Sequence, residues 1–457
     1  MHRYKLLVML AALAIMVLGA AGVGAQDDAV TLTMTCRCVE GGVNSNLVVW
    51  LKTYVIPTFE ERMAEQGVNV TVELVEFGGS DEQLKQQYAL DLGVGAGADL
   101  MSFDGFWVPE FVDAGLIQPL EAIAGEIVNE WDGWEHIPEA IQELLSYRGE
   151  RYGIPVGTDV RVIYYREDVF TEAGIEVPWQ PTSWADILET AEQLKEAGVE
   201  IPIQLNAGTP MGEATTMQGF FMALLGAGHH LYDFDEEKWI VSSPALLETL
   251  RFYEEIYVNR ELGDARMQLV EDGRQRSFEA FANGEVGMLV EGDFFWRSPM
   301  FELMGVEQRN SLVRFALMPA REPGAGYRGQ DYVTISGGTG WILNPNTEHP
   351  ELAWGLLSHM SDVDAVRAFQ LIQPRISFRD DVPVAGDPTM TAMADAALSL
   401  STVRPQLPEY PQISVEVQLM TERVVSGEMS PEEALEAYAE AVTELVGEEN
   451  VIRIPLE

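Results

Sequence analysis

The chain has 457 residues, of which 47% are hydrophobic and 9% aromatic, so it is long enough to bury the cores of two or three domains. Its 73 acidic and 28 basic residues give a formal net charge of −45. This charge excludes a nucleic-acid-binding role, because phosphates would be repelled over most of the surface. With so many carboxylates, pairs at suggestive spacings arise by chance and do not identify a catalytic couple.

The first 25 residues have the layout of a secretory signal. Basic residues precede an apolar run from Leu6 to Ala21, and Val23-Gly24-Ala25 is a small-residue pattern suited to signal peptidase. We therefore predict a signal peptide over residues 1–25 and an exported protein, periplasmic or extracellular. The alternative is an uncleaved segment that keeps the protein at the membrane, because the apolar run nearly reaches spanning length.

The segments after the signal alternate between strand and helix patterns. The sequence predicts strands at 30–35, 68–75 and 99–103, with helices at 46–66, 81–92 and 106–114. This β-α-β-α-β order predicts a mainly parallel sheet with helices on both faces. The glycine-rich stretch 93–97 follows a helix and precedes a strand, the reverse of a dinucleotide-binding loop, so no cofactor is predicted.

The second half of the chain is mostly helical. Helices are predicted from Thr182 to about Ala282, then strands at 286–290, 313–319 and 339–343. A helix follows from His349, and Ser430 caps the last one. Linker-like stretches are lacking, which suggests that the chain passes between its lobes more than once.

The most informative stretch runs from Gly149 to Phe170. Residues 160–165 are apolar and β-branched, which predicts a buried strand, and Pro155, Gly157 and Asp159 before them suit a bend. Further segments occur in a recognisable order and spacing: Tyr54–Glu60, Ala98–Asp104, Asp113–Leu120, Tyr152–Val156, Tyr164–Phe170, Pro181–Asp186, Phe281–Met288 and Gly337–Trp341.

Together these segments resemble the extracellular solute-binding proteins of ABC importers, and most closely the sugar-binding, maltose-binding-protein-like group (family 1). The resemblance implies an α/β fold of the periplasmic-binding-protein type II, with two lobes of mixed sheets joined by a hinge. It implies a first part of lobe 1 over 26–157, a first part of lobe 2 over 158–318, a return to lobe 1 over 319–360, and C-terminal helices over 361–457, mainly in lobe 2. Hinges are then expected near Asp159 and near Pro319–Ala320.

The resemblance also implies a ligand carrier rather than an enzyme. Such a protein would work as a monomer, capture a mono- or short oligosaccharide between its lobes and deliver it to ABC permease subunits in the membrane. The segment Tyr410–Val415 lacks the aromatic residues that some maltose-type members carry for long sugars, which favours a smaller ligand.

The positions that match the family's ligand-contacting segments supply two kinds of side chain. Aromatic rings can cover the C–H faces of a sugar, and carboxylates or guanidinium groups can bind its hydroxyls. The expected ligand-binding residues are Arg37, Cys38, Asp104, Phe106, Trp107, Asp159, Arg161, Phe294, Trp296, Gly338, Thr339, Trp341 and Arg375. For each aromatic residue the alternative is core packing, and for Arg375 it is a structural salt bridge.

Several alternatives stay open at this level. The two cysteines, Cys36 and Cys38, are compatible with a disulfide or with free thiols, and no cluster of His and Cys predicts a metal site. The solute could instead be a polyol-phosphate or a peptide-like compound. A secreted glycosidase would need two carboxylates in an aromatic cleft, and no pair stands out. A sensor or adhesion module of the same fold is a third class.

Overall fold

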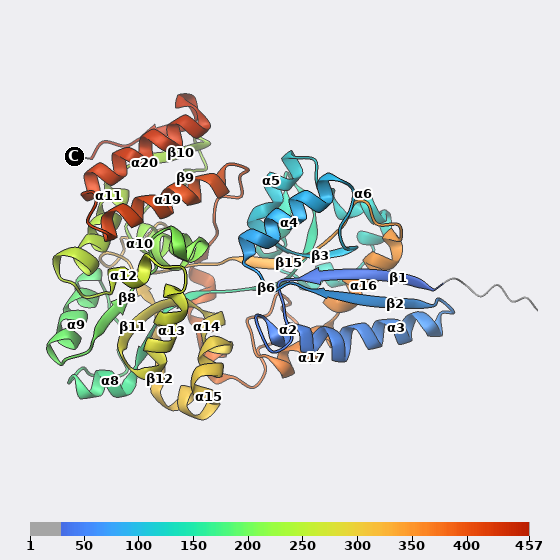
Figure 1. Ribbon diagram of the computed structural model, residues 1–457, viewed down its shortest axis with the longest axis horizontal. Coiled ribbons are helices and arrows are strands. Elements are labelled where there is room, and N and C mark those ends of the chain that lie inside the picture. Colours follow the sequence, from blue (N-terminus) through green and yellow to red (C-terminus); the bar gives the residue numbers. More distant parts are fainter. Residues whose placement is uncertain (1–28, 457) are drawn as a thin grey trace, which may run out of the picture.

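The computed structural model describes residues 29–456, and these residues form two α/β lobes that lie side by side (Figure 1). The predicted α/β class, with two lobes and mixed sheets, is confirmed. The predicted signal over residues 1–25 lies outside the described residues. Between residues 29 and 456, no helix is both long and apolar enough to cross a bilayer.

Lobe 1 is built on a five-stranded sheet with the order β2-β1-β3-β15-β6. Its strands are β1 (Val30–Cys36), β2 (Val70–Glu76), β3 (Leu100–Asp104), β15 (Gly338–Leu343) and β6 (Gly153–Thr158). The first three strands are parallel, and β15 runs antiparallel to both β3 and β6. The carboxyl end of β1 points toward lobe 2 (Figure 1). Loops that follow the parallel strands therefore lie at the junction of the lobes.

Helices cover both faces of this sheet. They are α2 (Ser45–Trp50), α3 (Ile56–Glu65), α4 (Asp81–Gly93), α5 (Val108–Asp113), α6 (Leu120–Ala124), α7 (Glu139–Gln142), α16 (Pro350–Ser361) and α17 (Val363–Ile372). A π-helical turn joins α2 to α3, so the single helix predicted over 46–66 is continuous with one irregular turn. A capping box between Ser80 and Gln83 begins α4, as the predicted N-cap requires. One apolar cluster lies under each face.

Lobe 2 contains a four-stranded sheet with the order β12-β7-β11-β8 and two smaller sheets. The strands are β7 (Arg161–Arg166), β8 (Ile201–Gln204), β9 (Tyr232–Asp233), β10 (Lys238–Ser242), β11 (Val286–Gly292), β12 (Val313–Ala316), β13 (Met318–Pro319), β14 (Tyr332–Ile335), β16 (Ser401–Thr402) and β17 (Val451–Arg453). Every residue of β7 and β11 is buried, as expected for central strands covered on both faces.

The helices of lobe 2 surround these sheets. They are α8 (Glu167–Glu172), α9 (Trp184–Glu196), α10 (Phe221–Gly226), α11 (Pro244–Glu254), α12 (Ala265–Gln268), α13 (Gly273–Asn283), α14 (Asp293–Arg297), α15 (Pro299–Leu312), α18 (Pro388–Ala397), α19 (Tyr410–Val425) and α20 (Pro431–Val446). In α9 the buried apolar residues are Trp184, Ile187, Ala191 and Leu194, because their spacing places them along one side of the helix. The Ser430 cap of α20 is present.

The chain crosses between the lobes three times, and two crossings differ from our expectation. The first lies between β6 and β7, at Asp159. The second was expected at Pro319–Ala320, but β13 pairs with β14 and both contribute to the core of lobe 2, so the crossing falls between β14 and β15. The helix α17 packs on lobe 1, and the third crossing therefore lies after residue 372 rather than at 361. Strand pairing decides the second crossing and helix packing the third, and neither contact is local in sequence.

Candidate ligand-binding site

An arginine ties the two lobes together at their junction. Arg404 follows β16 in lobe 2 and has a side chain that is only 8% exposed. Its Nη2 donates to Asp104 at the end of β3 in lobe 1 (2.9 Å), and its Nη1 donates to Glu213 of lobe 2 (2.9 Å). The guanidinium also lies over an aromatic ring, with its carbon 4.1 Å from the ring centre of Phe106. One cation therefore joins a carboxylate and an aromatic ring of one lobe to a carboxylate of the other.

Burial governs the electrostatics of this contact. It raises the pKa of Asp104 to about 6, although the positive charge of Arg404 opposes the shift. Glu213 is held by two hydroxyl donors of α19, since it accepts from Tyr410 (3.2 Å) and from Ser414. A small pocket beside the Arg404 side chain is lined by Phe106, Leu144, Gln406 and the backbone of residues 336–338.

Asp159 links the first and second crossings. Its carboxylate accepts from the backbone N–H of Gly337 (2.6 Å) and pairs with Arg161. Arg161 also donates to the carbonyl oxygen of Ile335 (3.0 Å) and to the side chain of Gln218 (3.2 Å). The predicted residues Asp159 and Arg161 therefore lie at the junction, where they hold two strands of the hinge together.

A second ion pair lies on the lobe 2 side. Glu291 is fully buried at the end of β11 and accepts two hydrogen bonds from Arg274 (both 2.8 Å) and one from Asn206 (3.0 Å). The guanidinium of Arg274 lies 5.3 Å from the ring centre of Phe294. The predicted aromatic Phe294 is thus placed beside a cation, as Phe106 is.

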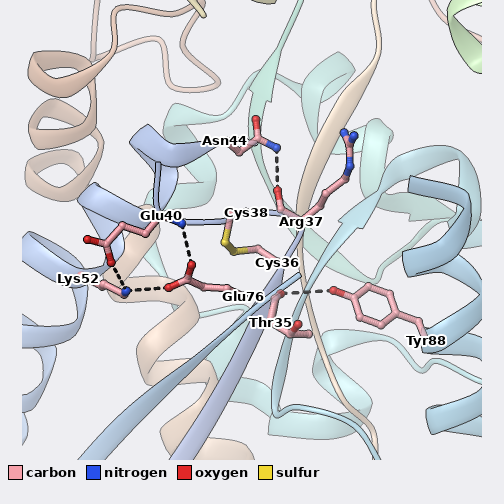
Figure 2. Close-up of a disulfide and its surroundings, with 9 residues drawn as sticks. All are labelled: Thr35, Cys36, Arg37, Cys38, Glu40, Asn44, Lys52, Glu76 and Tyr88. Atoms are coloured by element: carbon pink, nitrogen blue, oxygen red, sulfur yellow. Dashed lines mark hydrogen bonds and ion pairs between the residues drawn. A yellow bond between two sulfur atoms is a disulfide. The ribbon is translucent and has the colours of Figure 1, made fainter. Parts of the chain in front are cut away.

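The loop after β1 contains a disulfide between Cys36 and Cys38, which settles the alternative left open by the sequence (Figure 2). Arg37, between the two cysteines, donates to the carbonyl oxygen of Gly79 (2.9 Å) and to Asp81 at the start of α4 (3.0 Å). Its carbonyl oxygen accepts from Asn44 (2.8 Å). Arg37 keeps a third of its side chain exposed at this edge of lobe 1.

The structure corrects the prediction for Cys38. Its side chain is fully buried in the core of lobe 1 and its sulfur is bonded to Cys36, so it offers a ligand no surface. In the sequence, a small apolar residue next to a strand end could either contact a ligand or pack in the core. The disulfide to Cys36 decides for the core.

Two tryptophans that we expected to stack on a ligand lie in the cores instead. Trp296 is 1% exposed, its indole N–H donates to Asp387 (2.8 Å), and Arg309 covers its ring at 4.1 Å. Trp107 is 3% exposed and packs edge-on against Phe103 in lobe 1. Both rings are surrounded by groups of their own lobe, which excludes them as platforms in this structure.

The remaining predicted residues belong to β15 and to the third crossing. Trp341 is 1% exposed in the lobe 1 core, so it is also corrected to a core residue. Gly338 is buried, and a Cβ there would lie 2.4 Å from the Leu144 side chain, whereas Thr339 beside it is exposed. Arg375 reaches the first crossing, since a Cβ on Gly157 would lie 2.5 Å from its Nη2.

Four polar residues of the junction were missed at the sequence level, namely Glu213, Arg274, Glu291 and Arg404. Glu291 directly follows a predicted strand, which is a signal that could have singled it out. Arg404 lies in an irregular segment between Val403 and Pro405, and no pattern marks it. Its importance comes from its position between the lobes.

Comparison with known proteins identifies the family. A family model described as bacterial extracellular solute-binding protein matches residues 44–366, well over half of the chain. The chain belongs to this family. The predicted role as an extracellular solute-binding protein is therefore confirmed, and both the family and the similar solved structures consist of binding proteins.

Individual relatives are distant. A Brucella abortus protein named as a binding protein is 26% identical over 316 residues, which are 67% of this chain and 69% of that one. The arabinooligosaccharide-binding protein of Halalkalibacterium halodurans is 24% identical over 315 residues, 66% of this chain and 62% of that one. The crystal structure of an ABC transporter solute-binding protein from Thermotoga lettingae, bound with α-D-tagatose, superposes with a TM-score of 0.75 at 24% identity, covering 92% of this chain and 100% of that one. This likeness confirms the fold.

Proposed function

We propose that the solute is a small carbohydrate, which the protein captures between its lobes and delivers to the permease subunits of an ABC importer. The observation that carries the proposal is the arrangement around Phe106. An aromatic ring there lies beside the guanidinium of Arg404 and the carboxylates of Asp104 and Glu213, at the point where the lobes meet.

These groups match what a sugar presents to a protein. The C–H face of a sugar ring packs on an aromatic ring, and its hydroxyls need both donors and acceptors held in fixed directions. A ligand that replaces the Arg404 guanidinium on Phe106 would meet both requirements. The names of the relatives support this class of solute, since they include binders of tagatose and of arabino-oligosaccharides.

The wider role follows from the same proposal. The protein acts outside the cytoplasm as a monomeric carrier, and it catalyses no reaction on its solute. Arg404 donates to each of the two carboxylates beside Phe106, so a ligand would exchange hydrogen bonds with an existing network. The lobes close about the first and second crossings, which are bonded to each other through Asp159.

A thermal-shift screen tests the proposal. The mature chain is heated with a library of mono- and short oligosaccharides that includes D-tagatose and arabino-oligosaccharides. A bound sugar raises the melting temperature by mass action, and a hundredfold excess over Kd adds about 2.7 kcal/mol to the free energy of unfolding. Small-angle scattering of the best pair should show a smaller radius of gyration, because ligand selects the closed form.

A matched pair of variants locates the site. Phe106→Ala should abolish the shift, whereas Phe234→Ala, which removes a 53% exposed ring on the β9–β10 connection, should leave it unchanged. If both variants bind the sugar as the wild type does, the cleft assignment is wrong. If no carbohydrate in the library stabilises the wild type, the proposed class of solute is wrong.

A further inference from the structure

Five charged side chains meet where the chain crosses between the lobes. They are Asp159, Arg161, Asp293, Arg297 and Arg375. The carboxylate of Asp293 interacts electrostatically with the other four. Three guanidinium groups therefore face two carboxylates. The cluster carries one positive charge that the cluster itself does not balance.

Four members of the cluster have partners within the chain. Arg161 pairs with Asp159. Arg297 pairs with Asp293 (3.3 Å) and donates to the side chain of Gln373 (3.0 Å). Asp293 also accepts from a backbone N–H at the first crossing (3.3 Å). The two carboxylates are thus already engaged by the other two arginines.

The guanidinium of Arg375 is the exception. It donates no hydrogen bond to any residue between 29 and 456, and its Nε is buried without a partner. The ring of Phe369 lies 5.0 Å from its carbon. Burial and then the positive charge of Arg297 lower the pKa of Arg375 to about 9. The side chain as a whole is partly buried, and no carboxylate among residues 29–456 pairs with it, although the chain has 73 acidic residues.

The surroundings of Arg375 are suited to an external anion. A small, mostly apolar pocket borders it, with Trp50, Val156, Phe369 and Phe378 among its walls. Apolar walls strengthen the attraction between opposite charges, because they exclude water from between them. The absence of a side chain at Gly157 leaves room for Nη2 at the first crossing. The planar guanidinium offers two parallel N–H groups, which fit carboxylate and phosphate oxygens.

We propose that Arg375 binds an anionic oxygen group at the lobe junction, supplied by the carboxylate or phosphate of an acidic sugar. This inference rests on the proposed function and narrows its solute class. In the bound state the anion would balance the excess charge of the cluster and provide acceptors for the Arg375 guanidinium.

Matched pairs of sugars test the inference. The probes are D-galactose against D-galacturonate and D-glucose against D-glucose 6-phosphate, with sodium sulfate and sodium phosphate as free oxyanions. Thermal shifts and titration calorimetry at pH 7.5 should show that the acidic member of a pair binds at least tenfold more tightly. Arg375→Gln should abolish this preference, and Arg375→Lys, which keeps the charge, should retain part of it.

Arg453→Gln is the control variant. It makes the same change of charge at β17, where Arg453 pairs with Glu436 at the surface. It should keep the preference for the acidic sugar. Without ligand, the Arg375→Gln variant should melt no lower than the wild type, because the guanidinium it removes donates no hydrogen bond to any residue between 29 and 456.

The outcomes separate the two proposals. Equal binding of neutral and acidic sugars overturns the anion inference and leaves the proposed function standing. A preference that survives Arg375→Gln, or a large fall in the melting temperature of that ligand-free variant, also overturns it. Stabilisation by sulfate alone that depends on Arg375 supports the oxyanion site and assigns it to a free ion. A wild type that neither sugars nor oxyanions stabilise contradicts both proposals.

Discussion

Replacing Trp296 distinguishes a core residue from a ligand platform. Its ring is 1% exposed, its N–H donates to Asp387, and the guanidinium of Arg309 covers its face. Trp296→Ala removes both contacts and the buried ring itself from the interior of lobe 2. Truncation of a buried aromatic side chain typically costs about 3–5 kcal/mol, and we expect a value in that range here.

Trp296→Phe divides this cost into its parts. The variant keeps most of the buried apolar area and loses the donor to Asp387. That carboxylate retains Arg309 (3.0 Å) and two backbone N–H groups at the start of α18, so it is not left unpaired. The expected loss is about 1.5–3 kcal/mol, the usual value of a hydrogen bond to a charged group.

Urea unfolding of both variants, followed by binding measurements on the folded proteins, provides the test. The sugar with the largest shift on the wild type should bind both variants with unchanged Kd, because Trp296 contacts only groups of lobe 2. Phe106→Ala should show the opposite pattern, with weaker binding and a smaller loss of stability. If Trp296→Ala unfolds like the wild type and loses the sugar, our placement of this residue is refuted.

Three further predictions follow from the junction and the disulfide. Arg404→Met leaves Asp104 and Glu213 without their shared cation and should lower the free energy of unfolding by roughly 3 kcal/mol, measured in urea at pH 7. This is the low end for a broken buried pair, because each carboxylate is still 24% exposed. A loss below about 0.5 kcal/mol would contradict the prediction. The pKa of Asp104 is about 6 in the folded protein and roughly 3.9 in the unfolded chain. The favourable contribution of Asp104 to the free energy of unfolding is therefore complete below pH 4 and is lost as the pH rises through 6. The melting temperature of Asp104→Asn minus that of the wild type should therefore increase from pH 4 to pH 7, and a flat difference would rule the shift out. Cys36→Ala combined with Cys38→Ala opens a very short loop, so the chain-entropy model predicts a loss of only about 1–2 kcal/mol in the free energy of unfolding, measurable by chemical unfolding. Failure of the variant to fold would show that this model underestimates the stabilisation by the disulfide.

The sequence predicted those parts of the fold that depend on local patterns. Residues 30–35 and 68–75 alternate in a way that only strands satisfy, and the caps at Ser80 and Ser430 mark helix starts that the structure reproduces. The second crossing was misplaced because the resemblance alone, and no pattern in the residues themselves, located it near Pro319–Ala320. Their actual neighbour is β14, more than ten residues further on, and a pairing of that kind is not visible in a local pattern.

The candidate site was predicted only in part, for a related reason. Asp104, Phe106, Asp159 and Phe294 follow or precede strands that end at the junction, and strand ends can be located from the sequence. Whether an aromatic side chain near such an end turns toward the cleft depends on what packs beside it. Trp296 and Phe294 are two residues apart, yet one is enclosed by α18 and Arg309 while the other lies beside Arg274.

The cations that the junction uses are arginines, and their geometry explains why lysine would not serve there. Arg404 donates to both Asp104 and Glu213 while its guanidinium lies over the ring of Phe106. A lysine ammonium is a compact charge on a flexible stem, so it could pair with one carboxylate but could not stack and bridge at once. Planar groups with directed donors can exchange one acceptor for another. The contacts that hold the lobes together are therefore of the kind that the oxygen atoms of a sugar, or of an acidic sugar at Arg375, can replace.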